Sequence, residues 1–224
     1  MEKKTKRYII LQRYNKKMDI DYYTYKRESV KLGFIKTSKT ELIEILKAWL
    51  MISAAFGIVM GGFSLTQQFL ITLVLAAFTA GVGFLLHELA HKLVAQRYGA
   101  WAEFRSFDQM LILAVIMSFF GFVFAAPGAV FIHGKIDARK NGIISLAGPM
   151  TNLVLSFLFL LAKIFTPFWP VFLNYGFLIN GWLGVFNMIP FGNFDGRKIM
   201  VWSKPAFYGT LIAGVLLLFA GYLV

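Results

Sequence analysis

Cysteine is missing from this 224-residue chain, and histidine is scarce, with three residues in all. Without thiols the chain can form no disulfide, bind no metal through thiolate and use no cysteine nucleophile. The redox environment is left undetermined for the same reason. Any metal site must therefore be built from histidine and carboxylate side chains, and few positions can supply them.

Charged residues are also rare: they make up 15% of the chain, whereas hydrophobic residues make up 58% and aromatic residues 17%. This composition is too apolar for a water-soluble domain. Apolar stretches close to the roughly 20 residues that span a bilayer recur along the chain. They cover residues 48–63, 69–94, 110–132, 143–162, 171–189 and 206–222. The sequence predicts an all-α polytopic membrane protein with about five or six transmembrane segments.

Residues 1–47 precede the first apolar stretch and carry 13 Lys or Arg against 6 Asp or Glu. The segment is too long and too mixed in charge for a cleavable signal. We expect a retained, basic cytoplasmic segment ahead of a membrane domain at 48–224. Its charge favours the lipid bilayer as partner, and no nucleic acid is expected. The stretches "DYYTY" and "VKLGFIK" allow a small hairpin, and the spacing of Ser38 and Glu41 predicts a helix from near Lys39.

The stretch 110–132 decides the topology. If all six stretches cross and the N-terminus is cytoplasmic, the basic residues between 135 and 140 and between 197 and 204 face outside. If this stretch instead enters and leaves on one side, only Lys163 of the 23 basic residues lies outside, as the positive-inside rule prefers. Gly121, Pro127 and Gly128 would also interrupt a single helix. We therefore expect a re-entrant or β-hairpin element, which can line a cavity in the membrane.

The pattern "HELAH" places His87, Glu88 and His91 near the end of an apolar stretch. Histidines four residues apart project from one face of a helix and can reach one divalent ion, while Glu88 can act as general base on a water. Ionisable groups inside a membrane segment cost about 3 kcal/mol each and are usually functional. The competing interpretation is a polar network at the interface, with Lys92 at the level of the headgroups. We favour a zinc site.

A catalytic zinc site takes three protein ligands and leaves a fourth position open. Apart from Glu88, only one acidic residue after position 47 closes an apolar run, and this is Asp195. Pro190 should end the preceding helix, and Gly192 and Gly196 permit turns back towards a metal. We predict Asp195 as the third ligand; the alternative is an ordinary N-cap of the next helix. Five crossings place both motifs at the cytoplasmic ends of their helices, whereas six would place them at opposite membrane faces.

Three motifs follow one another on successive apolar stretches: "HELAH" at 87–91, "AGPMTN" at 147–152 and "NMIPFGNFDG" at 187–196. In this order they resemble the site-2 protease family of intramembrane zinc metalloproteases. The second motif of that family runs Asn-x-x-Pro-x-x-x-x-Asp-Gly, and it is matched from Asn187 to Gly196. The likeness covers residues 69–200.

The resemblance implies one Zn²⁺ ion held by His87, His91 and Asp195, with Glu88 as the catalytic residue. It also implies a three-helix catalytic core at 69–94, 142–163 and 171–190. Members of the family cleave a transmembrane protein substrate within or near the bilayer, often to release a regulatory domain.

Asn152 and Asn187 lie within apolar helices, where an amide either bridges helices or donates to the oxyanion formed during hydrolysis. For Asn187 both interpretations stay open, and for Asn152 helix packing is favoured over an oxyanion or substrate contact. We expect His133 to be an interfacial loop residue rather than an auxiliary ligand. The strand-like "GAVFI" at 128–132 offers an edge on which an extended substrate can pair.

The sequence thus predicts a multi-pass cell-membrane zinc endopeptidase that hydrolyses transmembrane proteins, in regulated intramembrane proteolysis. Its N-terminus and active-site opening are expected on the cytoplasmic side. A prenyl-protein endopeptidase would need a downstream Glu ligand, and no Glu follows Glu103. The remaining alternative is a non-enzymatic transporter or scaffold with a polar intramembrane site, which predicts no zinc and no dependence on Glu88.

Overall fold

The computed structural model describes residues 29–33, 35–123 and 127–223. It opens on a hairpin in which β1 (Ser29–Leu32) pairs antiparallel with β2 (Ile35–Ser38). Gly33 lies in the turn with a φ of 61°, a conformation that glycine adopts without steric strain. The hairpin expected from the two stretches "DYYTY" and "VKLGFIK" is not tested, because "DYYTY" lies outside the described residues. The observed hairpin turns within "VKLGFIK" itself.

Helix α2 (Lys39–Gly61) begins where the capping pattern predicted it. The Ser38 hydroxyl accepts a hydrogen bond from the Glu41 amide at 3.0 Å, which satisfies one of the unpaired N–H groups of the first turn. The helix runs without a break past residue 48. The boundary expected between the basic segment and the membrane domain therefore falls inside α2.

A continuous helix of 31 residues follows, made of α3 (Gln67–Ala76), the π-helical turn η1 (Ala77–Gly81) and α4 (Val82–Arg97). The Trp49 indole of α2 donates a hydrogen bond to the Ala77 carbonyl at 3.1 Å. A Cβ at Gly81 would lie 2.6 Å from the Ser53 hydroxyl, so α2 packs tightly against this turn. Single π-helical turns occur frequently at functional sites, and this one lies directly ahead of the HELAH motif.

The segment between α4 and the next core helix, called the excursion below, contains two paired strands and a short helix. β3 (Trp101–Ser106) pairs antiparallel with β4 (Gly128–His133), so that Ser106 lies opposite Gly128. Between the strands, α5 (Asp108–Ser118) has 11 residues, about half the length that crosses a bilayer. The ends of this excursion are thus side by side, which confirms the hairpin element expected between the HELAH helix and the next core helix.

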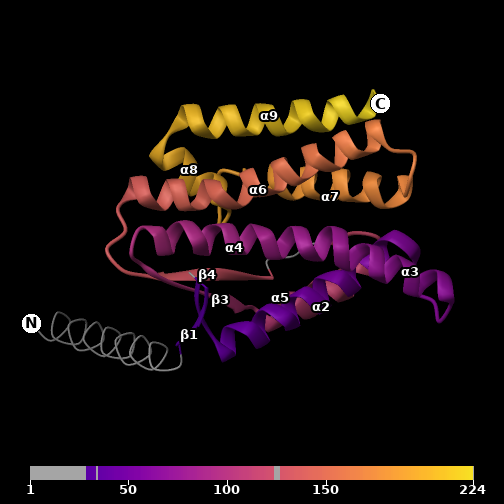
Figure 1. Ribbon diagram of the computed structural model, residues 1–224, viewed down its shortest axis with the longest axis horizontal. Coiled ribbons are helices and arrows are strands. Elements are labelled where there is room, and N and C mark those ends of the chain that lie inside the picture. Colours follow the sequence, from indigo (N-terminus) through magenta and orange to yellow (C-terminus); the bar gives the residue numbers. More distant parts are fainter. Residues whose placement is uncertain (1–28, 34, 124–126, 224) are drawn as a thin grey trace, which may run out of the picture.

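The rest of the chain is helical: α6 (Ala138–Phe165), α7 (Pro170–Asn187), α8 (Asp195–Trp202) and α9 (Lys204–Tyr222). Helix α6 is central and contacts α4, α7, α8 and α9. Figure 1 shows α4, α6, α7 and α9 stacked side by side. The three helices expected to form the core appear as the α3–α4 helix, α6 and α7.

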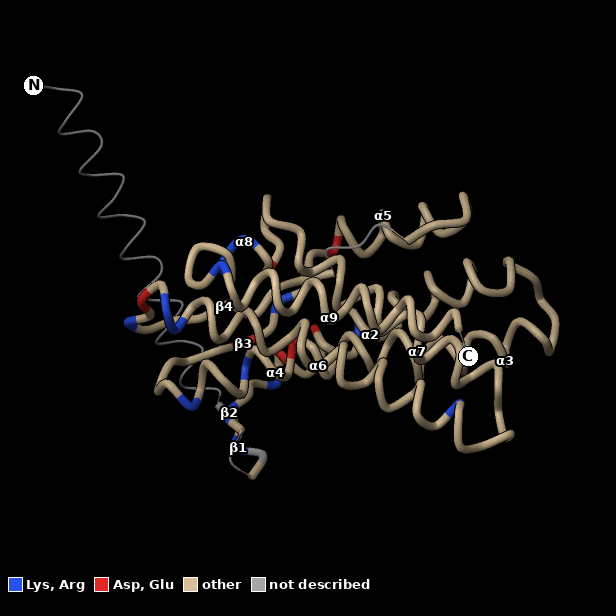
Figure 2. The backbone as a smooth tube through the Cα atoms, turned by 90° about the horizontal axis from the view of Figure 1, so that it is seen from above, with Lys and Arg blue, Asp and Glu red and all other residues tan. Residues whose placement is uncertain are grey.

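Within the described residues, four helices are long and apolar enough to cross a membrane: α2, the α3–α4 helix, α6 and α9. Helix α7, with 18 residues, carries Asn174, Asn180 and Asn187 and is not among these four. The structure therefore supports a polytopic helical protein. Figure 2 shows charged residues gathered at the end that holds β1–β4 and α8, while the opposite end is nearly free of them.

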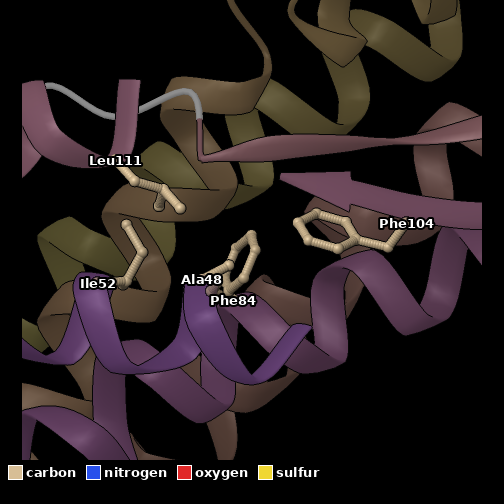
Figure 3. Close-up of a cluster of buried hydrophobic side chains, with 5 residues drawn as sticks. All are labelled: Ala48, Ile52, Phe84, Phe104 and Leu111. Atoms are coloured by element: carbon tan, nitrogen blue, oxygen red, sulfur yellow. The ribbon is translucent and has the colours of Figure 1, made fainter. Parts of the chain in front are cut away.

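A cluster of buried hydrophobic side chains joins the excursion to the bundle (Figure 3). It contains Ala48 and Ile52 of α2, Phe84 of α4, Phe104 of β3 and Leu111 of α5. The Phe84 and Phe104 rings meet edge to face, with centroids 5.7 Å apart, a favoured aromatic geometry. Packing of this kind holds the β3–β4 sheet against the helix that carries the HELAH motif.

Candidate metal centre and active site

His87 and His91 lie one turn apart on the same face of α4, and both side chains are buried. Their ring centroids are 4.7 Å apart and the ring planes are nearly perpendicular, at 83°. Their spacing of four residues places both rings on the face of α4 that packs against α6. Each ring then has one nitrogen to offer to a metal and one to offer to a neighbour.

Asp195, the first residue of α8, reaches the two histidines where the loop after α7 ends. Helix α7 ends at Asn187, and Gly192 takes a φ of 60° in the loop. A Cβ at Gly196 would lie 2.3 Å from the Met188 carbonyl, so glycine is needed where the chain folds back on itself. The Asp195 Oδ2 atom lies 3.3 Å from His87 Nε2 and 3.0 Å from His91 Nε2.

The N-cap interpretation of Asp195 is wrong. Asp195 is the first residue of α8, and the capping position belongs to Phe194, whose side chain makes no capping hydrogen bond. Burial raises the pKa of the Asp195 carboxyl, but the neighbouring His91 and His87 rings outweigh this effect and hold that pKa well below its usual range. The carboxyl is thus ionised, which is the form that binds a cation.

The other ring nitrogen of each histidine is held by α6. His87 Nδ1 lies 2.5 Å from Asn152 Oδ1, and His91 Nδ1 lies 2.7 Å from the Ile144 carbonyl. Both partners accept, so each Nδ1 atom carries a hydrogen, and each Nε2 atom is the nitrogen that faces Asp195 and is available to a metal. Metal-binding histidines in proteins almost always have such a partner on the second nitrogen.

The geometry fits one metal ion. The ligand atoms of the three side chains lie within 4.8 Å of one another, and all three residues are buried. Two ligands of a tetrahedral zinc ion at about 2.0 Å lie roughly 3.3 Å apart, close to the two distances that join Asp195 to the histidines. Gly148 of α6 faces the same point, since a Cβ there would lie 2.4 Å from His91 Nε2 and 2.5 Å from His87 Nε2.

A cavity of about 110 Å³ opens beside the three ligands. Glu88 and Asn187 line it, whereas Asn152 is fully buried behind His87. Lys198 also lines it and donates to Asp195 Oδ1 at 3.3 Å. Further lining residues were missed from the sequence: Asn141, Ser145 and Asn193. A helical spacing along α6, in which 141, 145, 148 and 152 share one face, could have revealed the first two.

Strand β4 forms one wall of the cavity, through Gly128, Ala129, Val130 and Ile132. The Phe107 amide donates to the Pro127 carbonyl at 2.9 Å, which continues the ladder of the β3–β4 sheet. Because paired bonds alternate along antiparallel strands, the N–H groups of Gly128, Val130 and Ile132 face away from β3. His133 ends this strand opposite Trp101, so it is a strand residue rather than a loop residue.

Lys92 corrects one expectation from the sequence. The residue is only 3% exposed, and its ammonium group pairs with the Glu41 carboxylate of α2, so it does not mark the headgroup level. Glu41 is fully buried and also accepts from the Thr37 hydroxyl at 2.6 Å and from the Phe104 amide at 2.9 Å. A single carboxylate therefore joins α2, β2, β3 and α4 just behind the HELAH motif.

The fold and the site together define a class: a helical protein with apolar helices of membrane-spanning length and a buried group of two histidines and one aspartate that can hold a metal ion. Comparison with known proteins agrees. The chain is 37% identical over 179 residues to a Methanocaldococcus jannaschii protein named "Putative zinc metalloprotease MJ0611", covering 77% of this chain and 89% of that protein. The chain therefore belongs to the zinc metalloprotease family that this relative represents.

A second protein of the same organism, named "Zinc metalloprotease MJ0392", is 28% identical over 134 residues. That alignment covers 58% of this chain and 34% of the relative. No family model matches the chain, and no solved structure matches it. The two names support zinc as the metal for the centre described above.

Proposed function

We propose that this protein is an intramembrane zinc endopeptidase of the site-2 protease type, which hydrolyses peptide bonds of transmembrane proteins. The observation that carries the proposal is the convergence of His87, His91 and Asp195 beside a cavity that Glu88 also lines. The HELAH motif lies on one of the four helices that are long and apolar enough to cross a membrane, and charged residues gather at the end of the bundle that holds β1–β4 and α8. The names of the relatives add that the chemistry is proteolysis with zinc.

Three side chains hold the ion in this proposal: His87 and His91 through Nε2 and Asp195 through a carboxylate oxygen. When bound, zinc supplies a Lewis acid that polarises the scissile carbonyl and makes water acidic enough to be deprotonated near neutral pH. Glu88 takes the proton from the attacking water and delivers it to the amide nitrogen as the C–N bond breaks. Lys198 neutralises the Asp195 oxygen that faces away from the histidines.

Asn187 suits a contact with the oxyanion. Its Nδ2 atom carries two hydrogens, and one of them is donated to the Leu183 carbonyl of its own helix at 2.9 Å. We assign the other hydrogen to the substrate oxygen, because Asn187 lines the cavity. Asn152 holds His87 Nδ1 at 2.5 Å and is assigned to the orientation of that ring, in place of a substrate contact.

The substrate strand binds along β4 in this proposal. A transmembrane helix must unwind before its backbone can approach a buried metal, and an extended strand is best held by an exposed strand edge. Gly128, Val130 and Ile132, whose N–H groups point away from β3, line the cavity beside the ligands. The same arrangement excludes lipid from the carbonyl that is attacked.

We further propose that the N-terminus and the mouth of the cavity are cytoplasmic and that the protein acts in the cell membrane as a multi-pass enzyme. This orientation is supported by the charged residues at the end of the bundle that holds β1–β4 and α8, because the positive-inside rule assigns a basic end to the cytoplasm.

Zinc content and cleavage of a model transmembrane substrate in detergent test the function. The wild type should bind one equivalent of zinc and cleave. Glu88→Gln should keep the zinc and lose at least about a hundredfold in rate, since general-base catalysis contributes about that factor or more. Asp195→Ala should lose both. Full cleavage by Glu88→Gln would overturn the mechanism, and a wild type without zinc would favour the transporter or scaffold alternative.

A further inference from the structure

Behind His87 two buried side-chain amides form a hydrogen-bonded row that connects the three core helices. Asn152 of α6, fully buried, accepts from His87 through Oδ1 and donates through Nδ2 to the Gly83 carbonyl of α4 at 3.1 Å. The same Nδ2 donates to Asn180 Oδ1 of α7 at 3.0 Å, and Asn180 is only 1% exposed. Asn180 Nδ2 in turn donates to the Gly176 carbonyl at 2.9 Å.

The orientation of both amide groups is set by the Gly176 carbonyl, at the end of the row farthest from His87. The Gly176 carbonyl can only accept, so it turns the amide nitrogen of Asn180 towards itself and leaves Oδ1 facing Asn152. That oxygen and the Gly83 carbonyl are both acceptors, so they hold the amide nitrogen of Asn152. The oxygen of Asn152 is then left for His87, and it can only pair with an Nδ1 that carries the hydrogen.

We propose that Asn180 is a positioning residue that selects the metal-binding tautomer of His87 through Asn152. An imidazole with its hydrogen on Nδ1 presents the lone pair of Nε2, which is the nitrogen that faces Asp195. The inference rests on the role of His87 as a metal ligand in the proposed function, but not on catalysis. Without Asn180, the Asn152 amide loses one of two acceptors and can turn its NH₂ group to Nδ1, which favours the tautomer that cannot bind the ion.

Close packing supports a dedicated position for this side chain. A Cβ at Gly83 would lie 2.2 Å from Asn180 Oδ1, so α4 has a glycine where the amide of α7 enters. Gly83 is one turn before His87 on the same helix. His87, Asn152 and Asn180 come from α4, α6 and α7, so their hydrogen bonds connect the three helices. An apolar side chain at 180 would have filled the space more simply, and a buried amide costs free energy unless it is fully paired.

The chain offers a matched control in Ser156. Its hydroxyl is fully buried in the same α6–α7 contact and donates to the Phe177 carbonyl at 2.8 Å, an acceptor outside the amide row. Ser156→Ala therefore removes one buried hydrogen bond between the same two helices. A general loosening of this contact would affect both variants alike.

Zinc affinity, measured by competition with a chelator, is the first test. Asn180→Leu keeps the side-chain volume at this position, and Asn180→Ala does not. Both variants should lower the zinc affinity by about tenfold or more, because each removes an outer hydrogen-bond partner of a metal ligand. Asn180→Asp should retain most of the affinity, because a buried, protonated carboxyl still has one donor and one acceptor. Ser156→Ala should stay within about twofold of the wild type. Equal affinities for Asn180→Leu and the wild type would overturn the proposal.

The second test reads the tautomer directly, by ¹⁵N NMR of the imidazole nitrogens in the zinc-free protein. The chain has only three histidines, so the signals can be assigned with His133→Gln and His91→Gln. His87 should carry its hydrogen on Nδ1 in the wild type, in Asn180→Asp and in Ser156→Ala, and should shift towards the other tautomer in Asn180→Leu. An unchanged tautomer in Asn180→Leu contradicts the inference even if the enzyme proves active. A wild type that binds zinc but cleaves nothing contradicts the proposed function alone.

Discussion

Gly148 shows how one residue can decide whether a metal fits. It lies on α6 within "AGPMTN". The structure places its Cα directly opposite the two Nε2 atoms, closer than any side chain could approach. The space that glycine leaves open is the space that the ion and its fourth ligand require.

Gly148→Ala should therefore abolish the metal site while leaving the bundle folded. The new methyl group would lie 2.4–2.5 Å from both ligand nitrogens, so either ring must turn away from its partner on α6. We expect zinc affinity to fall by about a hundredfold, the upper end of what disturbed ligand orientation causes. Chelator competition measures the affinity, and far-UV circular dichroism reports the fold.

Gly209→Ala is the control for that variant, because Gly209 lies in α9 with nothing within 4 Å of an added Cβ. It should bind zinc as the wild type does. If Gly148→Ala also retained its affinity, the centre would have to bind its metal away from the two Nε2 atoms.

At the scale of elements, Glu41 connects the N-terminal hairpin and α2 to the helix of the metal ligands. Its carboxylate accepts from Lys92 of α4, Thr37 of β2 and the Phe104 amide of β3. Glu103 of β3 adds a second buried carboxylate that accepts from the Ser38 hydroxyl. Residues 36–41 are thus part of the catalytic body of the protein and not only a charged flank.

Replacing one partner of the Glu41–Lys92 ion pair should destabilise the protein strongly. Lys92→Met leaves a buried carboxylate without its cation, and Glu41→Gln leaves a buried ammonium group without its anion; each should cost about 3 kcal/mol. The double variant leaves no unpaired charge and should recover much of that loss. Chemical or thermal unfolding in detergent measures the cycle, and strictly additive losses would mean that the two groups do not interact.

Strand β4 gives a second prediction at this scale, because its two edges differ. Proline at Val130 removes an N–H group that faces away from β3, whereas proline at Phe131 removes one that pairs with Glu103 of β3. Val130→Pro should lower substrate cleavage about tenfold, as expected for a lost main-chain contact, with unfolding nearly unchanged. Phe131→Pro should lower stability itself. Unaltered kcat/KM in Val130→Pro would argue against substrate pairing at this edge.

At the scale of the whole molecule, the two ends of the helix bundle differ in their content of charged residues. Helices α2, α6 and α9 start at the end that holds the charged residues and the metal ligands, and α4 and α7 end there. The excursion from β3 to β4 returns to the same end, since Ser106 pairs with Gly128. An arrangement with both motifs at one depth therefore needs no crossing between residues 107 and 127.

The absence of cysteine makes the topology easy to test. Single cysteines at Lys135, in the exposed loop before α6, and at Leu65, which is 96% exposed between α2 and α3, can be labelled in intact cells with a membrane-impermeant maleimide. Leu65→Cys should be labelled and Lys135→Cys protected until the membrane is permeabilised. Labelling of both variants from outside would place a crossing between α4 and α6, and labelling of Lys135→Cys alone would reverse the proposed orientation.

Much of the site could be read from the sequence because its signals are local. The four-residue spacing of His87 and His91 is a property of one helix, the glycines and proline around Asp195 act within one loop, and the capping pattern at Ser38 concerns one turn. The interruption of the stretch 110–132 was predictable because glycine and proline occur within it. That the stretch enters and leaves the membrane on one side follows from the positive-inside rule and stays a prediction.

The sequence by itself determined the ligand types, the helices that carry them and the apolar body, since residue chemistry and periodicity act over a few neighbours. Only the tertiary structure decided which partners meet: Asn152 and Asn180 behind His87, Gly148 opposite the ligands, and Lys92 turned inward to Glu41. These pairs are separated by 28 to 65 residues. Contacts across such distances depend on how whole helices pack, and buried amides and ions become favourable only when packing brings their partners within reach.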